Sequence, residues 1–195
     1  MKVGIPSEIK AQESRVGLTP QSVQQLTNHG HEVLVEKNAG FGAGFENADY
    51  EKAGAKIASS AADVFNDSDM IVKVKEPQSD EVNMLRENQI LFTYLHLSAA
   101  PELTKGLVDS KSICIAYETV TDENNRLPLL APMSAVAGRM SIQAGAHCLE
   151  KPQGGRGLLI GGAPGVNPGN VLILGGGVVG ENAATIATGM EAKVH

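Results

Sequence analysis

The stretch 171–180, V-L-I-L-G-G-G-V-V-G, constrains this chain more than any other part of the sequence. It is an apolar run that breaks into glycines at Gly175, Gly177 and Gly180 and continues as a helical pattern. In such a G-x-G-x-x-G turn the first glycine permits a tight turn, the second lets a pyrophosphate approach the backbone, and the third lets helix and strand pack closely. The helix N-terminus offers N–H groups to the phosphates. The stretch therefore predicts a dinucleotide-binding turn formed by Gly175, Gly177, Val178, Val179 and Gly180.

We expect the unit that contains this turn to be incomplete. A dinucleotide-binding unit continues through its helix, here Ala183–Met190, into a second strand, and an acidic residue about 20 residues after the glycines binds the ribose 2′-OH. Ala192–His195 has the pattern of the start of that strand, and the sequence stops there. We therefore predict that the chain is the N-terminal part of a longer protein and is inactive alone. The residue that would decide between NAD and NADP is not among the residues present.

Composition and charge argue against several classes of partner. The chain has 16 Lys and Arg residues against 22 Asp and Glu residues, a net charge of −6, so no basic field attracts nucleic acid or a membrane surface. No apolar run reaches about 18 residues and no charged-then-apolar leader is seen, which predicts a cytoplasmic protein without a membrane span. Cys114 and Cys148 lie in apolar patterns and are expected to be buried thiols. No His or Cys pair has metal-ligand spacing, so we predict no metal site.

Strand and helix patterns alternate through the first part of the chain. This alternation predicts an α/β fold, with a doubly wound parallel sheet in an N-terminal substrate domain over residues 1–128. The expected strands are Lys2–Ile5, His31–Glu36, Asp69–Lys75, Ile90–Leu97 and Ser112–Glu118, the last two buried on both faces. The expected helices start at the Thr19–Pro20 cap and end at Gly30, and then cover Asn47–Ala53, Ala61–Asn66, Asp80–Glu87 and Pro101–Ser110.

The pattern changes in the second part, which we assign to residues 129–195. Leu127–Pro132 is an apolar crossing with two prolines, and Ser134–Leu149 reads as a long helix rich in small residues. Gly154–Gly165 is dense in glycine and is expected to form a hairpin-like segment. The second part is therefore predicted to be a connecting helix followed by the truncated start of a Rossmann domain.

A small set of polar residues follows the predicted strands. In a parallel sheet, ligands gather outside the carboxyl ends of the strands. Lys75, His96 and Glu118 each end a predicted strand, and Arg15 lies in the loop after the first one. We expect these residues to line one crevice, together with Tyr94 and Tyr117.

Each of these residues also has a structural interpretation. Arg15 could pair with Glu8 or Glu13 on the surface, where such a bridge contributes little. Lys75 could be a solvated lysine like its neighbour Lys73, and Glu118 could orient another side chain. His96 could be a hydrogen-bonded structural histidine, although an imidazole that titrates near neutrality suits a general acid or base.

Several blocks of sequence, taken in order, closely resemble the family of NAD-dependent alanine dehydrogenases. The resemblance runs along the whole chain, so it is far more specific than any one motif. The matching blocks are V-G-I-P-S-E (Val3–Glu8), Arg15 with Thr19-Pro20, K-V-K-E-P (Lys73–Pro77), Y-L-H-L (Tyr94–Leu97), A-Y-E-T-V (Ala116–Val120), L-P-L-L-A-P-M-S (Leu127–Ser134), G-G-R-G (Gly154–Gly157) and the terminal G-G-G-V-V-G.

This resemblance implies the reversible oxidative deamination of L-alanine to pyruvate and ammonia, with NAD as cofactor. It implies that Arg15 binds the substrate carboxylate, that Lys75 polarises the carbon that receives hydride, and that His96 is the catalytic acid and base. It also implies that Met133 faces the substrate and Ser134 the nicotinamide nucleotide. Members of the family are typically hexamers, so a homo-oligomer is expected.

Two alternatives stay open. One is the nucleotide-binding subunit of a proton-translocating transhydrogenase, which shares the architecture and much of the early pattern but needs no amino-acid substrate. The K-V-K-E-P and Y-L-H-L blocks argue against it. The other is a non-catalytic paralogue that acts as an assembly module through the helix Ser134–Leu149.

Overall fold

The computed structural model describes all 195 residues of the chain. It divides into two compact units, Met1–Val120 and Thr121–His195. Strands and helices alternate in both units, which confirms the predicted α/β class. The functional domain boundary expected after residue 128 stays a prediction.

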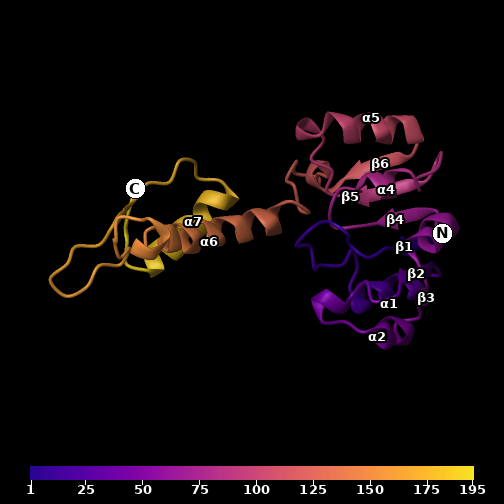
Figure 1. The fold of residues 1–195 in the computed structure, drawn as a ribbon, viewed down its shortest axis with the longest axis horizontal. Helices are drawn as coiled ribbons and strands as arrows, with labels where there is room; N and C mark the ends of the chain where they lie inside the picture. Colours follow the sequence, from indigo (N-terminus) through magenta and orange to yellow (C-terminus); the bar gives the residue numbers. More distant parts are fainter. The chain divides into compact units, whose positions relative to one another are not determined.

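The first unit is built on a six-stranded sheet whose paired strands all run parallel. Its strands are β1 (Lys2–Ile5), β2 (Glu32–Glu36), β3 (Lys56–Ala58), β4 (Met70–Val72), β5 (Ile90–Thr93) and β6 (Ile113–Ala116). The spatial order is β3-β2-β1-β4-β5-β6, so the direction of winding reverses between β1 and β4 (Figure 1). This is the predicted doubly wound sheet, with β3 as an edge strand that the sequence pattern did not reveal.

Helices cover both faces of this sheet. They are α1 (Pro20–Asn28), α2 (Asn47–Lys52), α3 (Ala61–Asp67), α4 (Ser79–Val82) and α5 (Pro101–Ser110). Val33 and Val35 of β2 belong to one core cluster, with side chains of α1 and α2. Leu34 lies between them and packs instead against a second cluster that contains Phe65 of α3 and Leu107 of α5. Because successive side chains of a strand point to opposite faces, the two clusters lie on opposite sides of the sheet.

The local signals that predicted the first helix act as expected. The Thr19 side chain accepts a hydrogen bond of 3.3 Å from the N–H of Ser22, and Pro20 occupies the first turn. Gly30, just beyond the helix, has a φ of +81°, a conformation that favours glycine.

Several expected elements are shorter than predicted. The strands after α3, α4 and α5 end at Val72, Thr93 and Ala116, two to four residues earlier than predicted, and the chain then enters loops or single 3-10 turns. The helix expected at Asp80–Glu87 is only the four residues of α4, because the following N–H groups of Met84 and Leu85 bond three residues back rather than four.

The prediction that β6 is buried on both faces was wrong. It is an edge strand, and Ile113 and Ile115 are 48% and 40% exposed. Cys148 is exposed and Cys114 is half-buried, so the expectation of two buried thiols was also wrong. Periodicity reports apolar character, but it does not report which strand lies at the edge of a sheet.

The second unit contains two helices and a two-stranded parallel sheet. Its elements are α6 (Ala131–Cys148), β7 (Asn170–Val171), α7 (Val178–Gly189) and β8 (Lys193–Val194). The helix α6 begins earlier than predicted because its first turn accommodates Pro132. A Cβ at Gly138 of α6 would meet the carbonyl oxygen of Val179, so α6 and α7 approach each other closely there.

Two further features of this unit bear on the predictions. The segment Gly154–Gly165 forms turns rather than a hairpin of strands, and its end is closed by a bridge between Ala163 and Val166. β8 pairs with β7, as the pattern of Ala192–His195 predicted, and the ladder extends to a bond of 2.9 Å from the Ile173 N–H to the His195 carbonyl.

None of the helices in the structure is both long and apolar enough to cross a bilayer.

Candidate functional site

The topology of the first unit brings the predicted polar residues to one edge of the sheet. Arg15 lies in the loop after β1, Lys75 after β4, His96 after β5 and Glu118 after β6. Because all these strands are parallel, their carboxyl ends lie at the same edge. The loops of β1 and β4 flank the reversal of strand order, which is the position where open α/β sheets bind ligands.

Arg15 is paired with Glu13. The Arg15 Nε and Nη2 atoms donate to the two oxygens of the Glu13 carboxylate at 2.8 and 2.6 Å, and the Arg15 backbone N–H donates at 2.9 Å. The side-chain bonds from Arg15 lower the pKa of Glu13 to about 2. Arg15 is thus paired with Glu13, one of the two partners that the sequence suggested. The contact is bidentate, as is common between a guanidinium group and a carboxylate.

Lys75 lies beside the same carboxylate. Its charge contributes to the lowered pKa of Glu13, and its Nζ atom is 4.0 Å from Oε2 of Glu76. The other oxygen of Glu76 pairs with Lys10. The Lys75 side chain is 24% exposed, so its ammonium group is partly shielded while still within reach of a small ligand.

His96 follows β5 in a left-handed backbone conformation, with φ 50° and ψ 39°. Its backbone N–H donates a hydrogen bond of 2.7 Å to Oε1 of Glu118, which also accepts from the Leu95 N–H at 3.1 Å. Burial would raise the pKa of Glu118, but these N–H groups and the nearby His96 hold it below its usual value. Glu118 thus orients a neighbour, as one interpretation of the sequence proposed.

Two tyrosines join these groups into one cluster. The Tyr94 ring stacks on the His96 ring with centroids 6.1 Å apart, and it meets the Tyr117 ring edge-on at 4.9 Å. Burial raises the pKa of Tyr117, and burial also raises the pKa of Tyr94 although the charge of Arg15 acts against it. Both phenols therefore stay neutral over the physiological range.

The interpretation of Lys73 as a solvated lysine was wrong. Its side chain is 0% exposed, and its Nζ atom lies 3.1 Å from Oε2 of Glu8 and 2.7 Å from Oε1 of Glu81. Sequence reasoning missed this group, although a signal was present. Ile71 is fully buried in β4, and Lys73 follows it by two residues. The alternation of a strand places both side chains on the same face.

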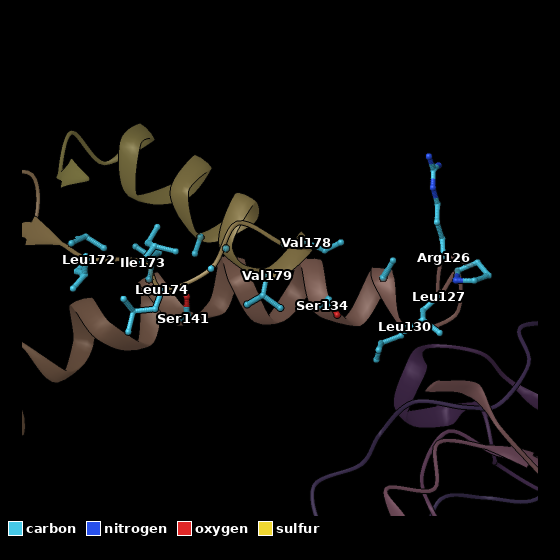
Figure 2. Close-up of a pocket in the computed structure, with 18 of the residues that line it drawn as sticks. Arg126, Leu127, Leu130, Ser134, Ser141, Leu172, Ile173, Leu174, Val178 and Val179 are labelled. Atoms are coloured by element: carbon cyan, nitrogen blue, oxygen red, sulfur yellow. The ribbon is translucent and has the colours of Figure 1, made fainter. Parts of the chain in front are cut away.

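The second unit contains a pocket of about 880 Å³ around the glycine turn (Figure 2). Its wall is mostly apolar and is formed by residues of the 122–130 segment, the 171–174 stretch, α6 and α7. All six residues predicted to contact the nucleotide line this pocket, namely Ser134, Gly175, Gly177, Val178, Val179 and Gly180. Met133 precedes Ser134 on α6 and is not among the lining residues.

The geometry of the turn fits a bound pyrophosphate. Gly175 has a φ of +105°, and a Cβ at Gly180 would collide with the Gly175 carbonyl oxygen, so both positions require glycine. A Cβ at Gly177 would meet no atom within 4 Å, so the space beside it is open. The first N–H bonded within α7 is that of Glu181, to the Gly177 carbonyl, which leaves the preceding N–H groups at the helix N-terminus for a ligand.

Models of two protein families match this sequence. The model described as alanine dehydrogenase/PNT, N-terminal domain, matches residues 4–137. The model described as alanine dehydrogenase/PNT, C-terminal domain, matches residues 141–195.

Relatives of known function extend beyond this chain. An alanine dehydrogenase of Halomonas elongata is 57% identical over 194 residues, which are 100% of this chain and 52% of that protein. An alanine dehydrogenase of Bacillus subtilis is 55% identical over 194 residues, 100% of this chain and 51% of that protein. The chain therefore spans about half the length of the relatives it matches.

Solved structures show the same relationship. An L-alanine dehydrogenase structure has a TM-score of 0.89 and 55% identity, and the match covers 98% of this chain and 53% of that one. The structure of a transhydrogenase from Sinorhizobium meliloti has a TM-score of 0.80 and 26% identity, with 100% of this chain and 57% of that one covered.

Proposed function

This chain belongs to the alanine dehydrogenase/PNT family, and from that membership we propose that it supplies the substrate site and the nucleotide turn of an NAD-dependent alanine dehydrogenase. The reaction is the reversible oxidative deamination of L-alanine to pyruvate and ammonia. The observation that carries this proposal is the gathering of Arg15, Lys75 and His96 at the carboxyl ends of three parallel strands.

Each of these residues suits one part of the reaction. The guanidinium group of Arg15 matches a carboxylate through two parallel bonds, as its contact with Glu13 illustrates, and would bind the carboxylate of alanine or pyruvate. The Lys75 ammonium would polarise the pyruvate carbonyl. The exposed imidazole of His96 would move the protons as ammonia adds and water leaves.

We propose NAD as the nucleotide. When bound, NAD supplies the hydride acceptor. The turn Gly175–Gly180 and the N-terminus of α7 would hold its pyrophosphate, and Ser134, which lines the same pocket from α6, would contact the nicotinamide nucleotide. A contact of Met133 with the substrate and a hexameric assembly stay predictions from the family resemblance, and a cytoplasmic location stays a prediction from the sequence pattern.

The test is the reduction of NAD by L-alanine, measured with the 195-residue chain and with a chain extended to the length of its relatives. In the extended protein, Lys75→Ala and His96→Ala should lower kcat/KM by a factor on the order of 100 or more, because each removes a group that acts in the transition state. The matched controls are Lys56→Ala and His147→Ala, whose side chains are 76% and 61% exposed and should leave the rate unchanged.

A different result would support the second candidate. If the extended protein binds NAD but does not oxidise alanine, the chain is better interpreted as a nucleotide-binding subunit of a transhydrogenase. In that case His96 would be a structural histidine, and His96→Ala would affect stability rather than turnover.

A further inference from the structure

Three charged side chains form a buried group beside the site in the first unit. The buried triad consists of Glu8, Lys73 and Glu81, whose side chains are 2%, 0% and 2% exposed. Removal of charges from water costs free energy that the attraction between them often fails to recover. A triad of this kind is therefore weak evidence for stability, and its contacts with the backbone indicate what it does.

Glu8 uses its two oxygens for two different contacts. Oε2 lies 3.1 Å from Nζ of Lys73. Oε1 accepts hydrogen bonds from the backbone N–H groups of Val74 at 2.6 Å and of Lys75 at 3.4 Å. The Glu8 carboxylate thus connects the buried ammonium group of Lys73 to the backbone of Lys75, the residue that we propose polarises the substrate.

The other side of this backbone is also fixed. The buried hydroxyl of Thr93 donates a hydrogen bond of 2.9 Å to the Lys75 carbonyl. The Tyr94 N–H donates to the Val74 carbonyl at 3.3 Å, so the pairing with the β5 segment continues past the end of β4. The Lys75 backbone is therefore held between Glu8 and Thr93, although it lies outside any strand.

Glu81 completes the triad from α4. Its Oε2 accepts from the Gln78 N–H at 2.8 Å in a capping box, while Oε1 lies 2.7 Å from Nζ of Lys73 but has no partner with hydrogen-bond geometry. Burial raises the pKa of Glu81, although Lys73 acts against it. Nζ of Lys73 thus lies within ion-pair distance of both carboxyl groups, but of the two only Glu8 also accepts from the Val74 and Lys75 N–H groups.

We propose that Glu8 is a positioning residue for Lys75, and that Lys73 serves to keep the Glu8 carboxylate in the interior where it can hold the Val74 and Lys75 N–H groups. A side chain attached to a fixed backbone has fewer positions available, so the ammonium group stays where the carbonyl of the substrate arrives. The proposal rests on the proposed function for the role of Lys75, but the contacts of Glu8 can be tested without it.

Two double variants separate the backbone contact from the charge. Glu8→Gln/Lys73→Met and Glu8→Leu/Lys73→Met both remove the buried ion pair and have similar volumes. Only the first keeps a side-chain oxygen that accepts from the Val74 N–H. Glu32→Gln, in the exposed pair with Lys56, is the control for the loss of a carboxylate elsewhere on the same sheet.

The first measurement is hydrogen exchange of the Val74 and Lys75 amides in the 195-residue chain. We expect exchange at least about tenfold faster in the Leu variant than in the Gln variant, because a lost hydrogen bond lowers the protection of its own amide. The control variant should exchange at these amides like the wild type. Equal exchange in the two double variants would show that Glu8 does not hold this backbone.

The second measurement is kcat/KM for pyruvate in the extended protein. The Leu variant should fall below the Gln variant by about 10- to 100-fold at equal thermal stability, the range expected for a displaced group. Equal rates together with unequal exchange would overturn the positioning of Lys75. If the wild type has no activity towards alanine or pyruvate, the proposed function fails, while the exchange rates still decide whether Glu8 fixes Lys75.

Discussion

The Glu118 carboxylate accepts a hydrogen bond of 2.7 Å from the backbone N–H of His96. The His96 backbone has a left-handed conformation, with φ 50°. This conformation costs a non-glycine residue roughly 1–3 kcal/mol and persists only where surrounding contacts enforce it. Glu118 is bound to the two amides at Leu95 and His96 and supplies that enforcement. The backbone that carries the imidazole is therefore held from a segment 22 residues further along the chain.

Substitution of Glu118 should reduce turnover through His96. Glu118→Ala removes the acceptor of the His96 N–H, so the backbone can relax and kcat should fall by about 10- to 100-fold. Glu118→Gln keeps an oxygen at the same position and should lose less. The measurement is kcat for alanine oxidation in the extended protein, with the exposed Glu87→Gln as control. An unchanged kcat in Glu118→Ala would contradict the orienting contact.

Elements with local start and stop signals could be predicted from the sequence. The α1 helix begins at Pro20 because Thr19 and Pro20 are adjacent, and it ends near Gly30 because glycine adopts a positive φ there. Such signals act within one turn of helix. The glycine turn of the second unit is predictable for the same reason, since the carbonyl that a Cβ at Gly180 would strike belongs to the same turn.

The ends of the central strands and the buried triad could not be predicted in this way. After β5 ends at Thr93, the N–H groups of Leu95 and His96 bond to Glu118, and Lys73 is buried beside Glu8, a residue 65 positions earlier. Both outcomes depend on partners that only the fold brings together. The in-phase spacing from Ile71 to Lys73 is a local signal, but lysine at such a position is ordinarily expected to reach solvent.

The pairing of Glu13 with Arg15 should make the first unit sensitive to acid. Arg15 lowers the pKa of Glu13 from 4.5 to about 2. A lowered carboxyl pKa contributes stability that is fully present above pH 4.5 and is lost as the pH falls towards about 2. The difference in urea midpoint between wild type and Glu13→Gln should therefore be greatest well above pH 4.5 and should vanish only as the pH falls below about 2.

Tyrosine fluorescence can follow this unfolding selectively. The chain has no Trp, and its three tyrosines, at positions 50, 94 and 117, all lie in the first unit. The control compares Arg15→Ala with Arg15→Ala/Glu13→Gln. Because no ion pair remains in this background, the difference in urea midpoint between these two variants should be small at every pH. A difference that persists unchanged down to pH 2 would show that another group is responsible.

Loss of the buried ammonium group should be far more damaging than loss of an exposed one. Lys73→Ala leaves the Glu8 and Glu81 carboxyls buried without their partner, which should lower the free energy of unfolding by about 3–5 kcal/mol. Lys56→Ala removes an exposed partner of Glu32 and should cost less than about 1 kcal/mol. Urea unfolding, monitored by tyrosine fluorescence, compares the two variants. Similar urea midpoints would contradict the buried pairing.

Two glycines of α7 should respond in opposite directions to replacement by alanine. A Cβ at Gly180 would collide with the Gly175 carbonyl, so Gly180→Ala should destabilise the helix by about 1–3 kcal/mol. Gly189 has no atom within 4 Å of such a Cβ and no positive φ, so Gly189→Ala should stabilise it by about 0.5–1 kcal/mol. Hydrogen exchange of the α7 amides measures both, and equal effects would contradict the close contact at Gly180.

Gly177→Ala should separate nucleotide binding from folding. The added Cβ meets no atom within 4 Å, and the φ of −80° at Gly177 suits any residue, so the fold should survive with a change below about 1 kcal/mol. The methyl group would occupy the space where the pyrophosphate approaches the backbone. We therefore expect the Kd for NADH, measured by titration calorimetry on the extended protein, to rise about tenfold or more. A Kd like that of the wild type would place the pyrophosphate elsewhere, because a ligand that does not approach this turn cannot sense the methyl group.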